Sequence, residues 1–386
     1  MGKLNNLVDA VKYSIGFVLA KFYRIINKKK IYLIGERKDQ CQDNGYFLFD
    51  YVRKYHKDKA FFYCITKDSK QLNKIIDLGN IIYYKSLKHY IYYFLAEKLV
   101  CAHVGSCTPD TAIVWKMEQY EKFKKDRIFI QHGVIKESIP SLMYENTEFK
   151  NFICGGKDEF EFVRDNFGYP KGAVQYIGLP RFDMLHNIKT KNYILVMPTW
   201  RKWFGMDDID ESSTGEFENS NYFKTYKSLL NNEKINELLK ENNLELIFYP
   251  HNEMQRYINL FKSKFENIKI AKVDEYEVQT LLKEAKILIT DYSSVAFDFA
   301  YMKKPIIYYQ FDEKEYFKKH YAKGYFEYRE NGFGRVCHDD KKLVEIIENI
   351  IENNYKMDGI YKERSERFFE LHDSKNCERN YKLITR

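Results

Sequence analysis

The feature of the sequence that most constrains its fold is an alternation of short apolar runs with stretches of helical periodicity, and this alternation occurs twice. The first series of apolar runs consists of residues 31–34, 61–65, 81–84, 99–102, 128–130, 152–154 and 174–177. The pattern restarts near residue 190 with the runs 193–197, 244–249, 268–270, 287–289 and 306–308, and with helical stretches at 233–242, 278–285 and 343–351. Continuous apolar runs joined by helices are typical of parallel strands covered on both faces.

Two such series predict an α/β protein with two facing, doubly wound, Rossmann-like domains. A chain of 386 residues has room for about two domains of the usual size. We expect the first domain over residues 31–188 and the second over 189–360. A basic helix over 1–30 precedes them, and a C-terminal helix over 361–386 could cross back to the first domain. In this architecture ligands bind beyond the carboxyl ends of the strands.

Composition narrows the classes of partner. The chain carries 63 Lys and Arg against 55 Asp and Glu, a net charge of +8. This excess suits an anionic substrate or an anionic membrane surface, and it is too dispersed to indicate nucleic acid. The seven cysteines form no CxxC pair, and no Cys/His group has the spacing of zinc ligands. We therefore expect no metal site.

The N-terminal segment 4–30 contains apolar residues at helical spacing. Its longest stretch without charge, residues 13–20, is far shorter than the roughly 20 residues that span a bilayer, and no small-residue cleavage site follows it. The apolar positions are Leu7, Val11, Ile15, Val18, Phe22 and Ile25, and three lysines close the segment at 28–30. This pattern predicts an amphipathic helix. Two interpretations remain open: contact with a membrane surface, or docking on the body of the protein.

Polar side chains follow several of the predicted strands directly. His132 and Gly133 follow the run 128–130, and a histidine there could accept a proton from a hydroxyl near neutral pH. Thr199 and Arg201 follow the run 193–197 and are suited to phosphate oxygens. His251 follows the run 244–249. For each residue a purely structural role is the alternative.

The run 287–289 leads into Asp291, Ser293 and Ser294, after which a helix with an apolar face is predicted. The N-terminus of a helix presents free N–H groups to anions, and serine hydroxyls extend such a site. A simple N-cap is the alternative role for Ser293.

Six ordered motifs together resemble one family. ITDYSSVAFDFA (289–300), KPIIYYQFDEKEY (304–316) and ENGFGRV (330–336) are similar to the C-terminal half of CDP-glycerol glycerophosphotransferases, enzymes of teichoic-acid and capsule-polymer synthesis. QHG (131–133), GLPRFDML (178–185) and MPTWR (197–201) occur in the family's order. Two positions differ from the common pattern: Val134 replaces a frequent Thr, and Tyr249 replaces a frequent Lys.

The resemblance implies a GT-B-like fold and a location on the cytoplasmic face of the membrane, as a peripheral protein. It implies transfer of glycerol phosphate or ribitol phosphate from a CDP-alditol to a lipid-linked saccharide or polymer, with release of CMP. The residues that match the family's motifs are His132 and His251 as catalytic groups, Thr199, Arg201, Asp291, Ser293 and Ser294 on the donor side, and Gly133 and Lys136 on the acceptor side.

In the expected mechanism His132 takes the proton of the acceptor hydroxyl and His251 assists the leaving phosphate. The sequence has no acidic triplet typical of a metal site, so we expect that no metal or other cofactor is required. The length of the chain leaves room for the two catalytic domains and the basic helix, which favours priming or single addition over polymerisation. The alternatives are a GT-B glycosyltransferase that uses a nucleotide sugar in cell-surface polysaccharide synthesis, and a membrane-bound scaffold without activity.

Overall fold

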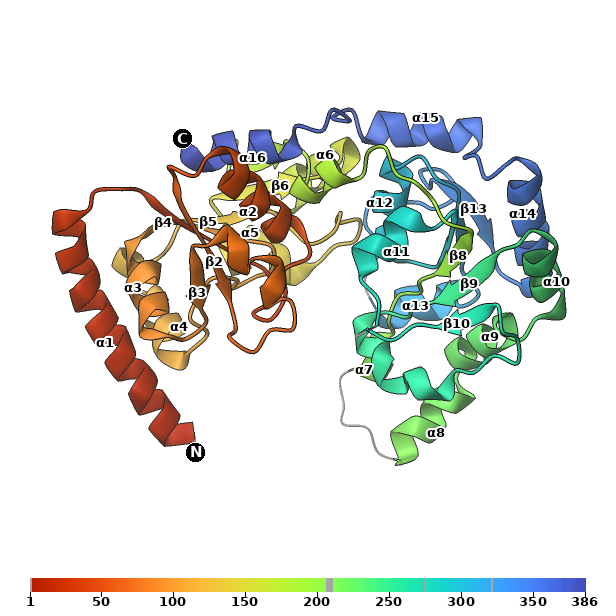
Figure 1. Cartoon of the computed structure of the whole chain (residues 1–386), viewed down its shortest axis with the longest axis horizontal. Coiled ribbons are helices and arrows are strands. Elements are labelled where there is room, and N and C mark those ends of the chain that lie inside the picture. Colours follow the sequence, from red (N-terminus) through yellow and green to blue (C-terminus); the bar gives the residue numbers. More distant parts are fainter. Residues whose placement is uncertain (1, 206–210, 274, 321) are drawn as a thin grey trace. The chain divides into compact units, whose positions relative to one another are not determined.

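The computed structural model describes residues 2–205, 211–273, 275–320 and 322–386. The chain forms two compact units, each built on its own parallel sheet (Figure 1). Unit 1 contains the residues up to Val134 together with Pro140–Met184 and Asp373–Arg386. Unit 2 contains Ile135–Ile139 and Leu185–His372.

The sheet of unit 1 has seven described strands in the order β3-β2-β1-β4-β5-β6-β7, and every pair is parallel. Its strands are β1 (Ile31–Gly35), β2 (Ala60–Ile65), β3 (Ile81–Tyr83), β4 (Ala96–Cys101), β5 (Arg127–Phe129), β6 (Asn151–Cys154) and β7 (Val174–Tyr176). Its helices are α1 (Gly2–Ile26), α2 (Asn44–Tyr55), α3 (Leu87–Leu95), α4 (Ala112–Glu118), α5 (Tyr144–Thr147), α6 (Lys157–Asn166) and α16 (Asn376–Thr385). Short 3-10 turns lie at Leu72–Lys74, Ile76–Leu78, Glu121–Phe123, Pro140–Leu142 and Pro180–Met184.

The sheet of unit 2 has six described strands in the order β10-β9-β8-β11-β12-β13, again all parallel. Its strands are β8 (Tyr193–Val196), β9 (Glu245–Phe248), β10 (Ile268–Ile270), β11 (Ile287–Thr290), β12 (Ile306–Tyr309) and β13 (Gly334–Cys337). Its helices are α7 (Lys202–Gly205), α8 (Glu211–Asn219), α9 (Asn221–Leu229), α10 (Glu233–Glu241), α11 (Val278–Glu284), α12 (Val295–Tyr301), α13 (Glu313–Lys319), α14 (Asp340–Glu352) and α15 (Gly359–Phe368). A 3-10 helix covers Asn252–Leu260.

The predicted fold class, two Rossmann-like α/β domains with an N-terminal helix, is confirmed. The sequence analysis missed strand β13, which lies at the edge of its sheet and begins with a glycine and an arginine instead of an apolar run. The single helix expected over 361–386 is wrong in detail. The chain forms α15 within unit 2 and, after a break, α16 within unit 1.

Helix α1 docks on helix α3 through a narrow face. Tyr13, Gly16 and Ala20 are buried, and the Tyr13 ring meets Phe94 edge-on at 4.9 Å between centroids. A Cβ atom on Gly16 would lie 2.7 Å from the Cβ of Tyr90, so only glycine allows this approach. The docked interpretation of the N-terminal segment is therefore correct for this face.

The opposite face of α1 is apolar and exposed. Val11 is 50% exposed, Ile15 44% and Phe22 61%, although a docked helix normally turns its apolar stripe inward. Leu7, Val18 and Ile25 continue this face. In the part of the chain that the structure describes, no helix is both long and apolar enough to cross a bilayer.

Candidate active site

His132 lies just beyond the carboxyl end of β5, on a turn that buried polar groups hold in place. Gln131 adopts a left-handed conformation (φ 57°), and its side-chain amide donates to the carbonyl of Ile153 and to the Glu159 carboxylate. Asn44, at the start of α2, donates its amide to the carbonyls of Ile130 and Gln131 at 3.1 and 2.9 Å. On this turn His132 keeps access to solvent, while one face of its ring packs against the protein.

A second histidine, His103, stacks on His132. The two rings are 4.2 Å apart between centroids and 6° from parallel. His103 follows β4, much as His132 follows β5. It was not among the predicted site residues, although its place directly after a predicted strand was a signal that could have identified it. The Nε of Arg37 lies 3.4 Å from the Nε2 of His103.

Both imidazoles of this pair are held neutral. Burial lowers the pKa of His103 to about 2, with smaller contributions from His132 and Arg37. Desolvation by the surrounding protein also lowers the pKa of His132, although the Asp43 carboxylate opposes this shift. The Nδ1 of His132 lies 3.2 Å from the carbonyl oxygen of Ala102, which can only accept a hydrogen bond. The proton is therefore on Nδ1, and the lone pair of Nε2 can act as a base.

Charged side chains around the pair come from the loops after β1 and β7. Glu36 is buried and accepts N–H bonds from Gln42, Asp43 and Tyr46, and burial together with Asp43 raises its pKa to about 8. Arg181, from the GLPRFDML motif, is 2% exposed and contacts Asp43 at 2.9 Å. These contacts fix the loops next to His132.

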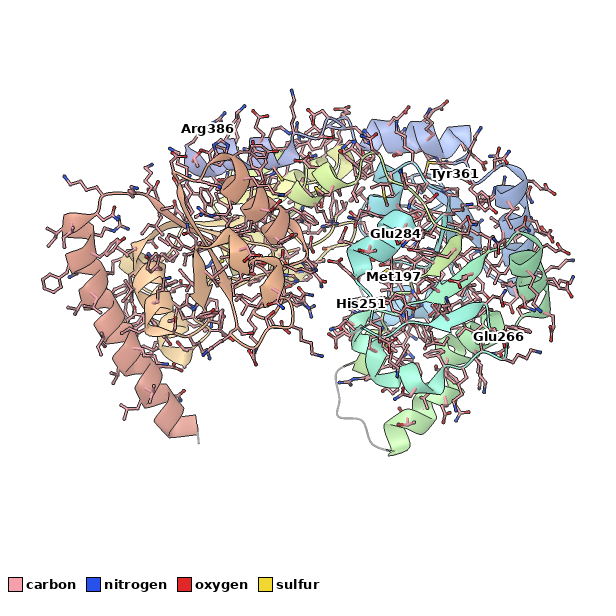
Figure 2. All side chains as sticks on the ribbon, in the orientation of Figure 1. Met197, His251, Glu266, Glu284, Tyr361 and Arg386 are labelled. Atoms are coloured by element: carbon pink, nitrogen blue, oxygen red, sulfur yellow. The ribbon has the colours of Figure 1, made fainter. Side chains whose placement is uncertain are left out.

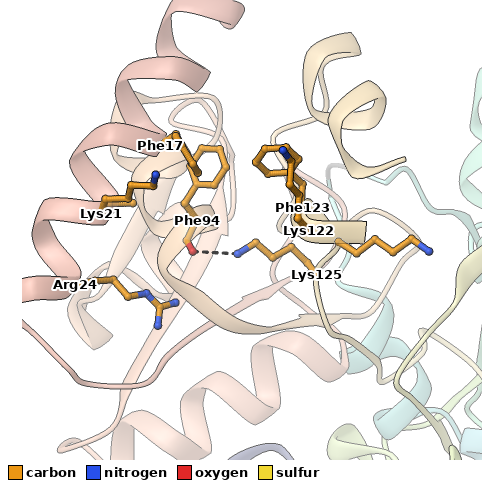
Figure 3. Close-up of a pocket in the computed structure, with 9 residues that line it drawn as sticks. Phe17, Lys21, Arg24, Phe94, Lys122, Phe123 and Lys125 are labelled. Atoms are coloured by element: carbon orange, nitrogen blue, oxygen red, sulfur yellow. Dashed lines mark hydrogen bonds between the residues drawn. The ribbon is translucent and has the colours of Figure 1, made fainter. Parts of the chain in front are cut away.

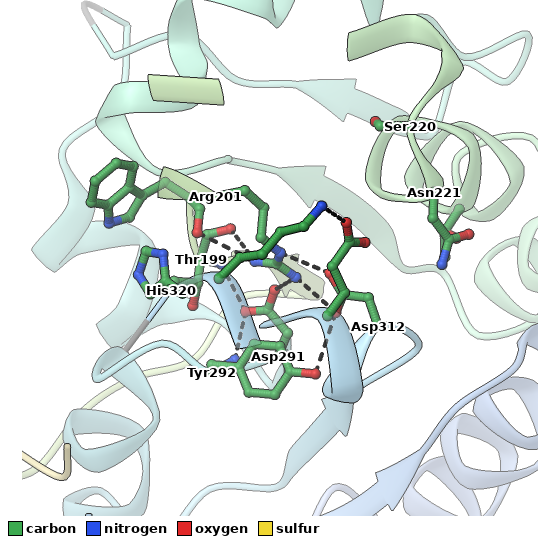
Figure 4. A network of polar contacts seen from close by, with 12 residues as sticks. Thr199, Arg201, Ser220, Asn221, Asp291, Tyr292, Asp312 and His320 are labelled. Atoms are coloured by element: carbon green, nitrogen blue, oxygen red, sulfur yellow. Dashed lines mark hydrogen bonds and ion pairs between the residues drawn. The ribbon is translucent and has the colours of Figure 1, made fainter. Parts of the chain in front are cut away.

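In unit 2 the guanidinium of Arg201 lies in a fully buried ion network (Figure 4). Its Nε and Nη2 contact the two oxygens of Asp312 at 2.8 and 3.0 Å, and Nη2 also contacts Asp291 at 2.8 Å. Nη1 donates to the carbonyl of Thr199 at 2.8 Å. Asp291 in turn accepts from the backbone N–H of Thr199 at 2.7 Å. The network therefore ties together the loops that follow β8, β11 and β12.

The predicted donor-side residues differ in their access to solvent. Arg201 and Asp291 are 0% exposed and bind each other, so they face no solvent-filled space in this structure. The Thr199 hydroxyl is buried without a hydrogen-bond partner in the described part of the chain. Ser293 and Ser294 are partly exposed, and Ser294 makes no side-chain cap bond to α12. Direct contact of any of these residues with a phosphate stays a prediction.

His251 follows β9 and begins the 3-10 helix Asn252–Leu260 (Figure 2). Its Nδ1 accepts from the N–H of Glu253 at 3.2 Å, and its ring stacks over Trp200 at 6.0 Å. Trp200 also meets His320 edge-on at 5.0 Å. Trp200 of the MPTWR motif thus contacts both His251 and His320. His320 was not among the predicted site residues, since it ends helix α13 instead of following a strand.

Lys136 lies in a different unit from the one expected. The sequence analysis placed Lys136 in the first domain with Gly133, but residues Ile135–Ile139 belong to unit 2. Ser138 forms an antiparallel bridge with Ala322, and a Cβ on Gly324 would lie 2.1 Å from the carbonyl oxygen of Lys136. Lys136 is 5% exposed and pairs with the Glu137 carboxylate.

No group of His, Cys, Asp and Glu side chains among the described residues has the geometry to hold a metal ion. The prediction that no metal is required is a statement about the reaction, and it stays a prediction.

The sequence profile of the CDP-glycerol:poly(glycerophosphate) glycerophosphotransferase family matches residues 17–386. The chain belongs to this family. Among its curated relatives, the minor teichoic acid biosynthesis protein GgaB of Bacillus subtilis (strain 168) is 32% identical over 94% of this chain and 40% of GgaB. The teichoic acid glycerol-phosphate primase of the same strain is 27% identical over 62% of each chain. The chain thus spans less than two thirds of the length of either relative.

A third family member, the teichoic acid poly(glycerol phosphate) polymerase of Bacillus spizizenii (strain ATCC 23059 / NRRL B-14472 / W23), is 24% identical over 86% of each chain. The solved structure of the wall teichoic acid polymerase TagF has a TM-score of 0.67 and 17% identity, and the match covers 99% of this chain and 97% of that one. UDP-GlcNAc 2-epimerase from Neisseria meningitidis has a TM-score of 0.53, 11% identity and coverage of 92% and 99%. The GT-B-like fold is therefore shared with enzymes of other chemistry and does not define the reaction.

We predict that Arg201→Ala lowers the free energy of unfolding by about 3–5 kcal/mol, because it leaves two buried carboxylates without their cation. Urea denaturation measures this loss. Arg335→Ala serves as the matched control, since Arg335 pairs with Asp358 at 3.2 Å in a partly exposed position and its loss should cost about 1 kcal/mol or less. Equal effects of the two substitutions would contradict the structural role of Arg201.

His320 should make stability depend on pH. Burial, with Arg201 and Lys136 nearby, lowers its pKa to about 3, from an ordinary value of 6.5. As the pH falls below 6.5 the unfolded chain takes up this proton and the folded chain does not. Stability should therefore fall by up to about 1.4 kcal/mol per pH unit from this residue. Urea denaturation from pH 7.5 to 5 should show a flatter dependence for His320→Asn than for the wild type.

Proposed function

We propose that this chain transfers glycerol phosphate or ribitol phosphate from a CDP-alditol to a saccharide or polymer acceptor, with release of CMP, in the synthesis of teichoic acid or a related capsule polymer. The observation that carries the proposal is the family match over residues 17–386. The curated relatives named above act in teichoic acid synthesis and include a primase and a polymerase.

In the proposed reaction His132 is the general base. The protonated Nδ1 bound to the Ala102 carbonyl fixes the tautomer, and the lowered pKa keeps Nε2 unprotonated at neutral pH. The neutral His103 ring, stacked on it, holds the His132 ring in its plane. Gly133, which follows His132 directly, is proposed to lie on the acceptor side.

Unit 2 is proposed to bind the cytidine diphosphate group. The partly exposed hydroxyls of Ser293 and Ser294 are suited to phosphate oxygens, and His251 is proposed to stabilise or protonate the leaving phosphate. Arg201 and Asp291 act as positioning residues, because their buried pair holds the Thr199 loop. Lys136 pairs with the Glu137 carboxylate in this unit, and Tyr316 donates to the same carboxylate at 3.4 Å, so no contact with a phosphate is proposed for Lys136.

The proposed step transfers a phosphoryl group and needs no oxidant or reductant. The acceptor oxygen attacks the phosphorus that carries the alditol, its proton passes to Nε2 of His132, and the phosphorus–oxygen bond to CMP breaks. No role in this step is assigned to a metal or another cofactor. A panel of CDP-glycerol, CDP-ribitol and UDP-sugars, analysed by mass spectrometry of the products, tests the donor. Transfer of a sugar from UDP would favour the glycosyltransferase alternative, and the number of units added distinguishes priming from polymerisation.

His132→Ala should lower kcat by about 10²–10⁴-fold, the usual contribution of a positioned acid or base, and leave the affinity for the CDP donor within a few fold. Ser293→Ala or Ser294→Ala should instead weaken donor binding about tenfold, through a lost hydrogen bond to a charged group. Single-turnover rates and donor titrations separate the two effects.

His56→Ala is the matched control, since His56 stacks on Tyr381 in the same unit at 3.8 Å and contacts none of the groups described around His132. Near-normal turnover of His132→Ala at saturating acceptor would overturn the role proposed for it.

We also propose that the exposed apolar face of α1 lies on the cytoplasmic surface of the membrane, where a lipid-linked acceptor would be found. Support comes from Val11, Ile15 and Phe22, which are exposed on the side of α1 away from α3, and from the lysines at 28–30 that follow the helix. Apolar residues gain free energy in the acyl boundary, and basic residues gain it near anionic lipids.

Val11→Ser, Ile15→Ser and Phe22→Ser combined should reduce binding to anionic liposomes by at least about tenfold, because each apolar side chain is worth roughly 1.5–3 kcal/mol when fully buried. Sedimentation with liposomes measures the loss, and circular dichroism checks the fold. The control is Ile360→Ser, which removes an apolar side chain that is 56% exposed in unit 2. Unchanged sedimentation of the triple variant would place the membrane contact elsewhere.

A further inference from the structure

A pocket of about 300 Å³ opens in unit 1 where α1 passes the end of α3 and residues 122–125 (Figure 3). Its apolar part is made of three aromatic rings. Phe17 of α1 meets Phe94 of α3 at 5.3 Å and Phe123 at 6.0 Å, edge-on in both cases. None of the residues that line the pocket belongs to the motifs assigned to transfer.

The charged part of the pocket is entirely cationic. Lys21, Arg24, Lys122, Lys124 and Lys125 line it, and no Asp or Glu does. Lys124 is neutralised by Glu121 and Glu148 at 3.1 and 2.8 Å. Within the described ranges, the other four cations make no ion pair with a carboxylate, and Lys21 and Lys122 instead lie over phenylalanine rings at 4.5 and 5.1 Å.

Two of these cations are already oriented by the backbone. The Nζ of Lys125 donates to the carbonyls of Phe94 and Ala96 at 3.0 and 3.3 Å, and Arg24 donates to the carbonyl of Leu95 at 2.7 Å. An ammonium has three N–H donors, so Lys125 has one that is not bonded to these carbonyls, on an ammonium that also lies 5.3 Å from the centre of the Tyr93 ring. Burial and the nearby Arg24 lower the pKa of Lys125 to about 8, and a bound anion would oppose this shift.

The place of the pocket on α1 indicates what it meets. With 3.6 residues per turn, Lys21 and Arg24 lie on the flank between the docked face of Tyr13 and Ala20 and the exposed apolar stripe on the other side. If that stripe enters the acyl boundary, as proposed above, the flank lies at the depth of the lipid head groups. The role of this pocket thus depends on the membrane contact proposed above.

We propose that this pocket binds the phosphate head group of an anionic membrane lipid, with the four unneutralised cations around the phosphate and the three aromatic rings against the glycerol and first methylenes. Basic pockets beside membrane-embedded apolar surface bind such head groups in other proteins, which gives the assignment its chemical basis. The site would fix the orientation of unit 1 on the bilayer and would also increase the affinity of unit 1 for the bilayer.

The test uses a short-chain phosphatidylglycerol below its critical micelle concentration, titrated into the full-length protein by calorimetry. Lys21→Gln with Lys122→Gln removes two exposed cations of the pocket and should weaken binding about 30-fold, if each contributes as lysines do near anionic lipid. Lys28→Gln with Lys29→Gln removes the same charge next to the helix but outside the pocket lining, and should change binding less than twofold. The double variant Lys21→Arg with Lys122→Arg keeps both charges and should bind the lipid as the wild type does.

Short-chain phosphatidylcholine and inorganic phosphate are the comparison ligands. Three results would each overturn the proposal. Phosphatidylcholine could bind as tightly as phosphatidylglycerol, inorganic phosphate could bind as tightly as the lipid, or the two double Gln variants could have equal affinity for phosphatidylglycerol. Because no bilayer is present, the Val11, Ile15 and Phe22 triple variant should bind the short-chain lipid normally. Loss of liposome binding in that variant therefore tests the membrane contact, and this titration tests the pocket.

Discussion

The buried contact of Arg201 with Asp291 and Asp312 is the interaction on which the geometry of unit 2 depends. The three side chains come from loops after three different strands, and each would be costly to bury alone. Because the guanidinium has N–H groups in a fixed plane, it binds both carboxylates only when the three loops are correctly placed. The partly exposed serines at 293 and 294 directly follow this network, so it fixes where they stand.

In unit 1 side-chain amides hold the turn that carries His132. Asn44 binds the carbonyls of Ile130 and Gln131, and Gln131 binds the carbonyl of Ile153 and the buried Glu159 carboxylate. The result is a histidine with one protonated nitrogen committed to the Ala102 carbonyl and a second ring stacked against it. For the role of general base proposed for His132, this arrangement is in place before a substrate binds, which would lower the reorganisation that proton transfer requires.

Helix α1 shows that docking and membrane contact need not be alternatives. Gly16 allows the backbone of α1 to approach Tyr90 closely, so a narrow face is sufficient to attach the helix to α3. The wider apolar face, with Val11 and Phe22, then remains exposed. A helix attached in this way presents its apolar stripe beside the cationic pocket that it forms with α3 and residues 122–125.

The sequence by itself determined the strands, since strands buried on both faces must be continuous apolar runs, and it determined the family through ordered motifs. It missed β13, whose edge position relaxes the need for an apolar run. The site was predicted only in part. That His132 ends a strand is a local property, but its stacking on His103, the burial of Arg201 and the place of Lys136 in unit 2 depend on residues far away in the chain. Only the tertiary structure decides such contacts, because a side chain's role depends on the burial and charge that other segments provide.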